Sequence, residues 1–298
     1  MRNTFIRALV EQARVNDKII LMVGDLGYSA IEPFRDEFPD RFINAGVAEQ
    51  NMTAMAAGMA SEGFQVFTYS IANFPTFRPA EQIRNDIDYH NLSVTVVSVG
   101  GGLAYGNLGY SHHAVQDFSL MRAMPNVLIA APCDPMQTQN CVEYIVKNPR
   151  PYYLRLNKAG EPNLTSKTDP TLPGVPYLRN ADKTNSNLIL STGAVFDILF
   201  NIWEKNEEFK SNWSIGNLPI WGESTRADTR SYLEGFDKVV SVEEHLLAGG
   251  FGSWLLETGI NCIPCHLDIK SVGKVGSQMY LRKDLEEKLL NIINDCRL

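Results

Sequence analysis

The sequence of 298 residues lacks the features that mark membrane, secreted and nucleic-acid-binding proteins. Its longest apolar runs, such as residues 94–99, are far shorter than the ~20 residues that cross a bilayer. Residues 1–5 hold no apolar signal-peptide core. The net charge is −7, so we expect no nucleic acid as a partner. We expect a soluble, cytoplasmic protein without a membrane partner.

Cysteine is also scarce, with five residues in the chain. An odd number in a long chain of this kind argues against a disulfide framework. Cys262 and Cys265 form a C-x-x-C pair, but no second pair at zinc-binding spacing accompanies it. A redox role stays open, although the pair lies in an apolar, strand-like stretch. The favoured interpretation is therefore buried structural cysteines, and we assign no metal ligands to this chain.

Short apolar runs alternate with helical patterns through most of the chain. This alternation predicts an α/β fold with mainly parallel, doubly wound sheets. The length suggests two domains, and prolines gather between them. We expect a first domain at 1–157, a linker at 158–187 and a smaller second domain at 188–298. The predicted strands are 18–23, 41–45, 65–69, 93–99, 127–131, 152–156, 188–191 and 238–242, and the predicted helices are 48–60, 79–89, 135–147, 193–204 and a last one ending at 257.

A carboxylate stands at the start of a helix rich in small residues. Glu49 follows a predicted strand in the stretch Asn44–Met52 (NAGVAEQNM). A negative charge at a helix N-terminus is favourable in itself, because the helix dipole attracts it. Side chains beyond the carboxyl ends of parallel strands also form ligand sites. Both interpretations of Glu49 stay open at this point.

Two further loops follow predicted strands. Residues 69–77 (YSIANFPTF) contain Phe74 and Phe77, which could stack on a planar ring, although such aromatics are more often core. Residues 100–113 (GGGLAYGNLGYSHH) are rich in glycine and end in His112 and His113. Glycine permits positive φ angles and close approach of the backbone to a ligand. The loop does not fit the glycine patterns of nucleotide-binding proteins.

The order of these motifs resembles the pyrimidine-binding half of transketolases. The resemblance continues through residues 117–135 (DFSLMRAMPNVLIAAPCDP), 239–244 (VVSVEE) and 249–253 (GGFGS). It covers nearly the whole chain and is best for transketolase C-terminal subunits. It implies a pyrimidine-binding domain followed by a transketolase C-terminal-like domain. It also implies thiamine diphosphate as cofactor and transfer of a two-carbon ketol unit from a ketose to an aldose.

The resemblance gives each candidate residue an expected role. Glu49 matches the glutamate that bonds the aminopyrimidine ring and drives its proton chemistry, which makes it both catalytic and cofactor-binding. Phe74 and Phe77 resemble the aromatics that pack on that ring. His112 matches the histidine that contacts the ketol hydroxyls and the reacting oxygen. The remaining expected substrate-binding residues are Asp25, Ser29, His113, Arg2 and Lys158, the last two as cations for a sugar phosphate.

Two positions depart from the family pattern. The family's aspartate four residues before the loop histidine falls here on Leu108, and its upstream histidine falls near Gly100. The resemblance gives that aspartate the task of reading donor stereochemistry. We therefore expect an unusual or modified sugar as substrate.

A missing motif predicts a partner. Transketolases bind diphosphate and magnesium through a G-D-G…N motif, which this sequence lacks. We expect an N-terminal subunit to hold Mg²⁺ and the diphosphate, with an α2β2 assembly. Two alternatives stay open. One is the β-subunit of a 2-oxo-acid dehydrogenase, and the other is a non-catalytic scaffold or regulatory subunit.

Overall fold

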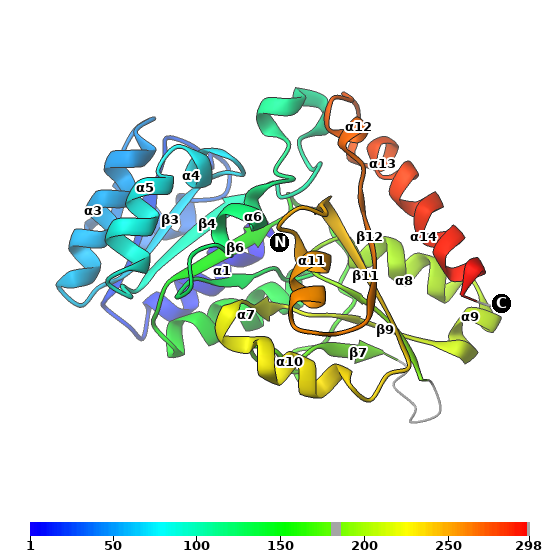
Figure 1. Ribbon diagram of the computed structural model, residues 1–298. Coiled ribbons are helices and arrows are strands. Elements are labelled where there is room, and N and C mark those ends of the chain that lie inside the picture. Colours follow the sequence, from blue (N-terminus) through cyan, green and yellow to red (C-terminus); the bar gives the residue numbers. More distant parts are fainter. Residues whose placement is uncertain (180–185, 297–298) are drawn as a thin grey trace.

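The computed structural model describes residues 1–179 and 186–296 and places two sheets beside each other (Figure 1). Helices cover both faces of each sheet. The predicted α/β class is therefore confirmed. None of the helices in the described residues is long and apolar enough to cross a membrane. All five cysteines are free thiols.

The first sheet has the strand order β10-β5-β6-β4-β3-β1-β2. Every neighbouring pair is parallel except β10 with β5. Strands β1, β4 and β6 are buried throughout, as expected for a sheet covered on both faces. The strands are β1 (Ile19–Val23), β2 (Phe42–Asn44), β3 (Gln65–Ile71), β4 (Val94–Val99), β5 (Leu128–Ala130), β6 (Tyr152–Leu156) and β10 (Ile220–Trp221).

Helices α1 and α7 pack on one face of this sheet, while α3, η2 and α6 cover the other. The predicted helix at 79–89 is instead the short α5 followed by η2, whose hydrogen bonds have the wider π spacing. The α-helices are α1 (Arg2–Ala13), α2 (Glu32–Glu37), α3 (Glu49–Ser61), α4 (Phe74–Phe77), α5 (Ala80–Gln82), α6 (Asp117–Met121) and α7 (Pro135–Lys147). The other helical segments are η1 (Pro39–Arg41), η2 (Ile83–Asp88), η3 (Gly106–Leu108) and η4 (Tyr110–His112).

The second sheet has the order β12-β11-β8-β9-β7. Its edge strand β7 (Tyr177–Arg179) lies inside 158–187, where the sequence predicts a linker, and residues 180–185 of that segment lie outside the described residues. The other strands are β8 (Asn187–Ser191), β9 (Trp213–Asn217), β11 (Lys238–Leu246) and β12 (Cys262–Leu267). The helices are α8 (Phe196–Glu204), α9 (Glu207–Asn212), η5 (Glu223–Thr225), α10 (Arg226–Leu233), α11 (Phe251–Glu257), α12 (Ile269–Val272), α13 (Gln278–Leu281) and α14 (Lys283–Asp295).

One hydrophobic cluster contains buried side chains from both halves of the chain. Strand β10 comes from the second half of the chain but pairs antiparallel with β5 of the first sheet. Its Trp221 is fully buried and lies 5.3 Å from Phe118 and 5.2 Å from Phe251, measured between ring centroids. Trp221 also donates a hydrogen bond to Thr192. The second half therefore packs directly against β5 and α6 of the first half.

Candidate active site

The predicted site residues follow strands of the first sheet. Strands β1, β2, β3, β4 and β6 run parallel, so the loops that follow them emerge at one edge. These loops and the helices that directly follow them carry every predicted residue except Arg2, which begins α1. The backbone N–H of Arg2 donates to the carbonyl of Lys158 at 3.0 Å, which brings the start of α1 to the same edge.

Glu49 is the first residue of α3 and is only 3% exposed. One carboxylate oxygen accepts a hydrogen bond from Arg78 Nη1 at 2.7 Å. Within the described residues this is the one ion pair of the Glu49 carboxylate. A buried carboxylate beside the free N–H groups of a helix end can hold or move a proton for a bound ring.

Phe74 begins α4 and presents a ring face to a planar group. The guanidinium carbon of Arg78 lies 4.0 Å from the ring centroid of Phe74. The Arg78 side chain therefore stacks on Phe74 while it bonds to Glu49. The planar Arg78 guanidinium thus makes the two contacts, stacking on Phe74 and a hydrogen bond to Glu49, that a bound flat heterocycle would make at this place. Phe77, at the other end of α4, is 46% exposed.

The glycine-rich loop brings His112 to this group. The rings of His112 and Phe74 lie 5.4 Å apart in an edge-to-face arrangement. Ser111 Oγ lies 3.0 Å from His112 Nδ1. Partial burial and the neighbouring His113 lower the pKa of His112, which favours the neutral imidazole. A neutral imidazole can exchange a proton with a substrate hydroxyl.

His113 lies in a different environment. Its side chain is 1% exposed, and its Nδ1 and Nε2 face the carbonyl oxygens of Val272 and Gly106 at 3.0 and 3.5 Å. Asn73 donates to the carbonyl of His113 at 2.8 Å. In this structure the His113 ring therefore connects the glycine-rich loop to the second half of the chain through Val272.

Asp25 and Ser29 lie in the loop between β1 and α2. Both have positive φ angles, 56° and 67°. Asp25 accepts hydrogen bonds from Asn44 and Tyr28, which lower the pKa of its carboxyl group. Ser29 is exposed and borders a cavity of about 370 Å³ between α1 and α2. Asp25 is thus hydrogen-bonded to Asn44 at the end of β2, the strand that precedes Glu49. Ser29 instead lies next to α1.

Lys158 lies over Tyr105, a residue of the glycine-rich loop for which the sequence predicts no role. The Lys158 ammonium lies 4.4 Å from the centroid of the Tyr105 ring. Burial raises the pKa of Tyr105, and the positive charge of Arg2 opposes that rise. The Tyr105 ring also lies 6.3 Å from that of His112. The predicted cation Lys158 and the predicted catalytic histidine thus both lie close to one aromatic ring.

The two positions that depart from the family pattern differ in their surroundings. Leu108 is 57% exposed. Gly100 has a φ of 91°, and a Cβ atom there would lie 2.0 Å from Cε2 of Tyr105. Tyr105 therefore takes the space that a side chain at position 100 would need.

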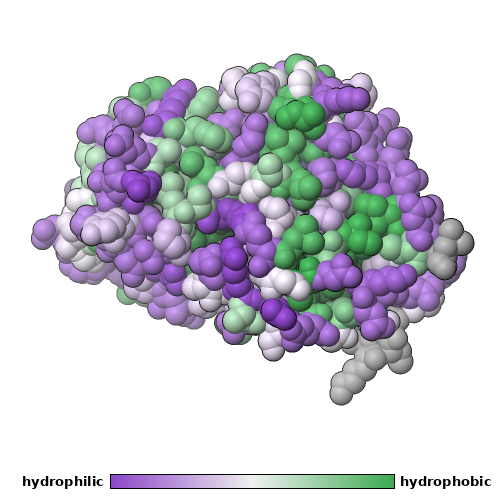
Figure 2. Space-filling model, viewed as in Figure 1, coloured by the Kyte–Doolittle hydropathy of each residue, from purple (hydrophilic) through white to green (hydrophobic). Residues whose placement is uncertain are grey.

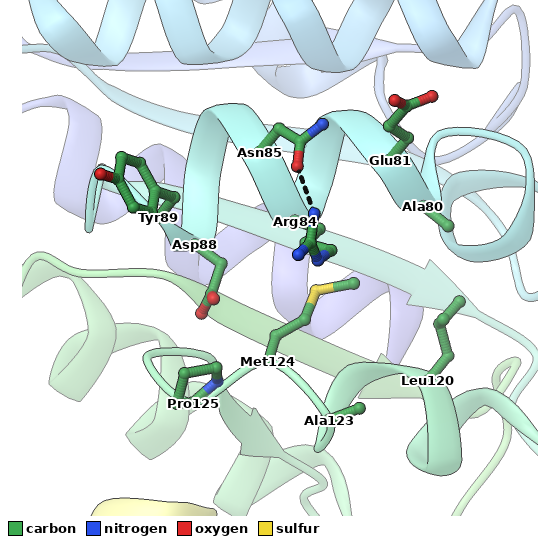
Figure 3. A pocket seen from close by; sticks show the side chains of 10 residues that line it. All are labelled: Ala80, Glu81, Arg84, Asn85, Asp88, Tyr89, Leu120, Ala123, Met124 and Pro125. Atoms are coloured by element: carbon green, nitrogen blue, oxygen red, sulfur yellow. Dashed lines mark hydrogen bonds between the residues drawn. The ribbon is translucent and has the colours of Figure 1, made fainter.

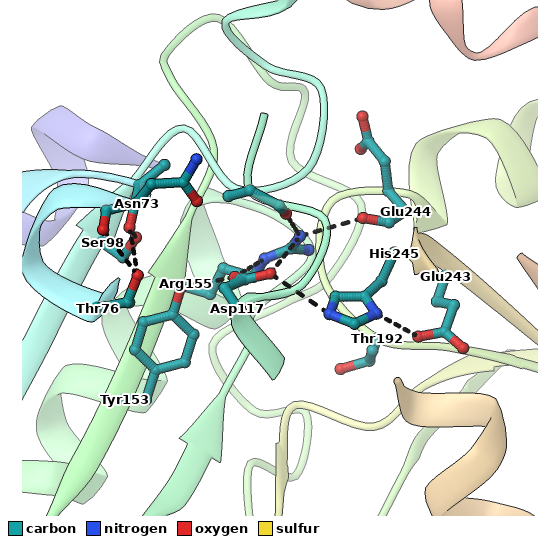
Figure 4. A network of polar contacts seen from close by, with 12 residues as sticks. Asn73, Thr76, Ser98, Asp117, Tyr153, Arg155, Thr192, Glu243, Glu244 and His245 are labelled. Carbon is teal, nitrogen blue, oxygen red and sulfur yellow. Dashed lines mark hydrogen bonds and ion pairs between the residues drawn. The ribbon is translucent and has the colours of Figure 1, made fainter. Parts of the chain in front are cut away.

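A buried polar network supports the glycine-rich loop, and Figure 4 shows its members Arg155, Asp117 and Glu244. Arg155 on β6 donates to Asp117 on α6 at 2.7 Å and to the carbonyl of Glu244 on β11 at 3.1 Å. The Glu244 carboxylate accepts the backbone N–H of Leu103 at 2.8 Å and pairs with Arg282. The second half of the chain therefore holds the loop that carries His112.

A cavity of about 460 Å³ opens at Glu49 and is lined by residues 47–51 and Arg78. A larger cavity of about 860 Å³ lies between η2 and the segment after α6, and none of the predicted site residues lines it (Figure 3). The buried Glu49 carboxylate and the stacking face of Phe74 fit an aminopyrimidine ring.

In the described residues no group of three or more His, Cys, Asp or Glu side chains could hold a metal ion.

These features define an α/β protein with a candidate ligand site at the carboxyl edge of a parallel sheet. Residues 1–161 match the family model described as "Transketolase, pyrimidine binding domain". The chain is 30% identical over 261 residues to an apulose-4-phosphate transketolase subunit of Phocaeicola vulgatus, covering 86% of this chain and 82% of that protein. It is 31% identical over 291 residues to the 6-deoxy-6-sulfo-D-fructose transketolase subunit SqwH of a Clostridium species, covering 95% and 89%.

A solved structure described as a split gene transketolase, an inactive beta4 tetramer, superposes with a TM-score of 0.82 at 26% identity. The superposition covers 99% of this chain and 96% of that one. The chain belongs to the transketolase family. The resemblance inferred from the motifs is therefore confirmed.

Sequence reasoning missed Arg78, Tyr105 and Glu244. Arg78 stands four residues after Phe74, the spacing at which helical side chains meet, and this was the available signal. Tyr105 lay within a loop interpreted through its glycines and histidines. The contact of Glu244 with Leu103 joins residues 141 positions apart, and no local pattern reveals such a contact.

Proposed function

We propose that this chain is the cofactor-activating subunit of a split, thiamine-diphosphate-dependent transketolase that acts on a modified sugar. The observation that carries the proposal is the buried Glu49 carboxylate beside the stacking face of Phe74. The cofactor, when bound, supplies a thiazolium carbon that takes up a two-carbon ketol unit. This chain supplies the groups that bind the pyrimidine and the sugar. The cytoplasmic location expected from the sequence remains a prediction.

Each side chain has a proposed task. Glu49 bonds the pyrimidine ring and holds or moves its proton, and Phe74 packs on the ring face, with Phe77 at the rim. His112 contacts the ketol hydroxyls of the substrate. Arg2 and Lys158 bind an anionic end of the sugar, and Asp25 and Ser29 border the substrate channel. For His113 we propose a positioning role, because its ring nitrogens face backbone carbonyls.

The partner is proposed to be an N-terminal subunit that holds the diphosphate and Mg²⁺, in an α2β2 complex. Two of the similar proteins are named as transketolase subunits, which supports this proposal because a subunit implies a companion chain. Their named sugars, apulose 4-phosphate and 6-deoxy-6-sulfofructose, support a modified sugar as substrate. Leu108 and Gly100, which depart from the family pattern, support the same proposal.

The test replaces Glu49 in the complex of this chain with its N-terminal subunit. Glu49→Gln removes the charge and the proton-transfer capacity with little change in volume. We expect ketol transfer to fall at least about a hundredfold, the effect typical of a lost acid–base group. The matched control is Glu62→Gln, an exposed glutamate that follows the same helix.

Two rival functions predict different results. A 2-oxo-acid dehydrogenase β-subunit would oxidise 2-oxo acids in the complex and transfer no ketol unit. A non-catalytic subunit would leave activity unchanged in Glu49→Gln. Cofactor binding, followed by tryptophan fluorescence, separates loss of binding from loss of chemistry.

A further inference from the structure

The Tyr105 ring lies beside three positions of interest, namely Gly100, the predicted cation Lys158 and the predicted catalytic His112. It stands at the start of η3, in the loop that carries His112, and is partly buried. Its ring fills the space beside Gly100, where a Cβ atom would approach to 2.0 Å. Because Gly100 also has a φ of 91°, no ordinary side chain fits at position 100 without strain. The Tyr105 ring therefore occupies the space beside Gly100, in the loop that carries His112.

Two positively charged residues near Tyr105 indicate the charge of the ligand that this part of the site can bind. The Lys158 ammonium lies over the Tyr105 ring, and the backbone N–H of Arg2 donates to the carbonyl of Lys158, which brings the two cationic residues together. In the part of the chain that the structure describes, neither Arg2 nor Lys158 forms an ion pair with a carboxylate. An aromatic face orients an ammonium group but leaves its full positive charge in place. The two cations can therefore still bind an anion.

We propose that Tyr105 is a specificity-determining residue: it closes the space beside Gly100 and positions Lys158, so that the site favours ketoses ending in a phosphate or sulfonate group. This inference rests on the proposed ketol-transfer function. The proposed role belongs to the aromatic ring of Tyr105 and not to its hydroxyl group, because both Gly100 and Lys158 lie next to the ring. The phenol oxygen forms no hydrogen bond with another described residue.

The test measures kcat and KM in the complex of this chain with its N-terminal subunit. Three donors share one carbon skeleton: 6-deoxy-6-sulfofructose, fructose 6-phosphate and uncharged fructose. The measured quantity is the ratio of kcat/KM for each anionic donor to that for fructose. The sulfonate and phosphate arms show which of the two anions the site favours.

We expect the wild-type complex to prefer an anionic donor, and Tyr105→Leu to lower that preference about tenfold, the effect of losing a partly desolvated cation–π contact. The loss should lie mainly in KM for the anionic donor. Tyr105→Phe keeps the ring and should keep the preference. Lys158→Met should lower the preference by a similar factor, and the double variant should lower it no further, because the two side chains act as one unit.

Tyr232→Leu, a half-exposed tyrosine on α10, is the matched control for loss of an aromatic side chain. The inference is overturned if Tyr105→Leu keeps the wild-type preference, if the effects of Tyr105→Leu and Lys158→Met simply multiply, or if the wild-type complex favours fructose. Each of these outcomes leaves the proposed ketol transfer standing, although a preference for fructose would also contradict the proposed modified sugar. Absence of ketol transfer from all donors would instead refute the proposed function. Thiamine diphosphate affinity, measured by fluorescence titration, should be the same in all variants.

Discussion

At the scale of single residues, the site is organised around a carboxylate and an arginine. Arg78 stacks on Phe74 and bonds to Glu49, so it makes the two contacts proposed for the pyrimidine ring. Arg78 is 44% exposed, whereas Glu49 is almost fully buried. Water therefore screens one partner of the pair, and its strength must be below that of a fully buried pair.

A double-mutant cycle should measure this interaction. We expect Arg78→Met and Glu49→Gln to be coupled by about 1 kcal/mol in the free energy of unfolding. Arg78→Met leaves a buried carboxylate without its cation, so it should destabilise the wild-type protein more than it destabilises the Glu49→Gln variant, whose amide is neutral. Urea denaturation of the four proteins gives the coupling energy. Additive effects would show that the ion pair does not contribute to stability.

At the scale of structural elements, strand β11 supports the glycine-rich loop across the two halves. Glu244 accepts the N–H of Leu103, and its carboxylate pairs with Arg282, which is 6% exposed. The side chains that position His112 thus come from both halves. A Cβ atom at Gly102 would lie 2.6 Å from the Glu244 carboxylate carbon, so the close approach requires glycine.

Two glutamates that pair with arginine should respond differently to the same change. We expect Glu244→Gln to lower the free energy of unfolding by about 3 kcal/mol, because it leaves Arg282 as a buried charge with less compensation. Glu257→Gln should cost at most about 1 kcal/mol, because Glu257 is 45% exposed in its pairs with Arg122 and Arg226. Chemical denaturation of both variants provides the comparison. Equal losses would contradict a special role for the buried pair.

At the scale of the whole molecule, hydrophobic side chains remain exposed near the site. Val47 is 70% exposed, Phe77 46% and Leu108 57%. Further apolar surface lies over α12 and α13, where Ile269 and Met279 are more than two-thirds exposed (Figure 2). Exposed apolar groups beside a ligand site are typical of a surface that another subunit covers. This agrees with the proposed complex.

Assembly should therefore depend on Val47. We expect Val47→Asp to weaken binding of the N-terminal subunit at least about tenfold, since an unpaired charge would be buried in the interface. Val15→Asp, at an 83% exposed valine after α1, is the matched control and should bind normally. Light scattering during titration of the two subunits measures both. If Val47→Asp binds the N-terminal subunit as tightly as the wild type does, the partner does not cover the surface around Val47.

The sequence alone determined the fold class and the order of the motifs. Alternating apolar runs and helical periods are local signals, and a glutamate after a strand or a histidine after a glycine-rich loop is visible in the sequence itself. Strands such as β1, β4 and β6 were predicted to within one or two residues for this reason. The family followed from the same ordered motifs, and the comparisons confirm it.

Only the tertiary structure decided how these residues meet. The stacking of Arg78 on Phe74, the burial of His113 and the position of Tyr105 beside Gly100 depend on how separate loops pack at one edge of the sheet. The pairing of β10 with β5 and the contact of Glu244 with Leu103 join distant parts of the chain. Such contacts depend on shape and burial in three dimensions, and a one-dimensional pattern does not carry that information.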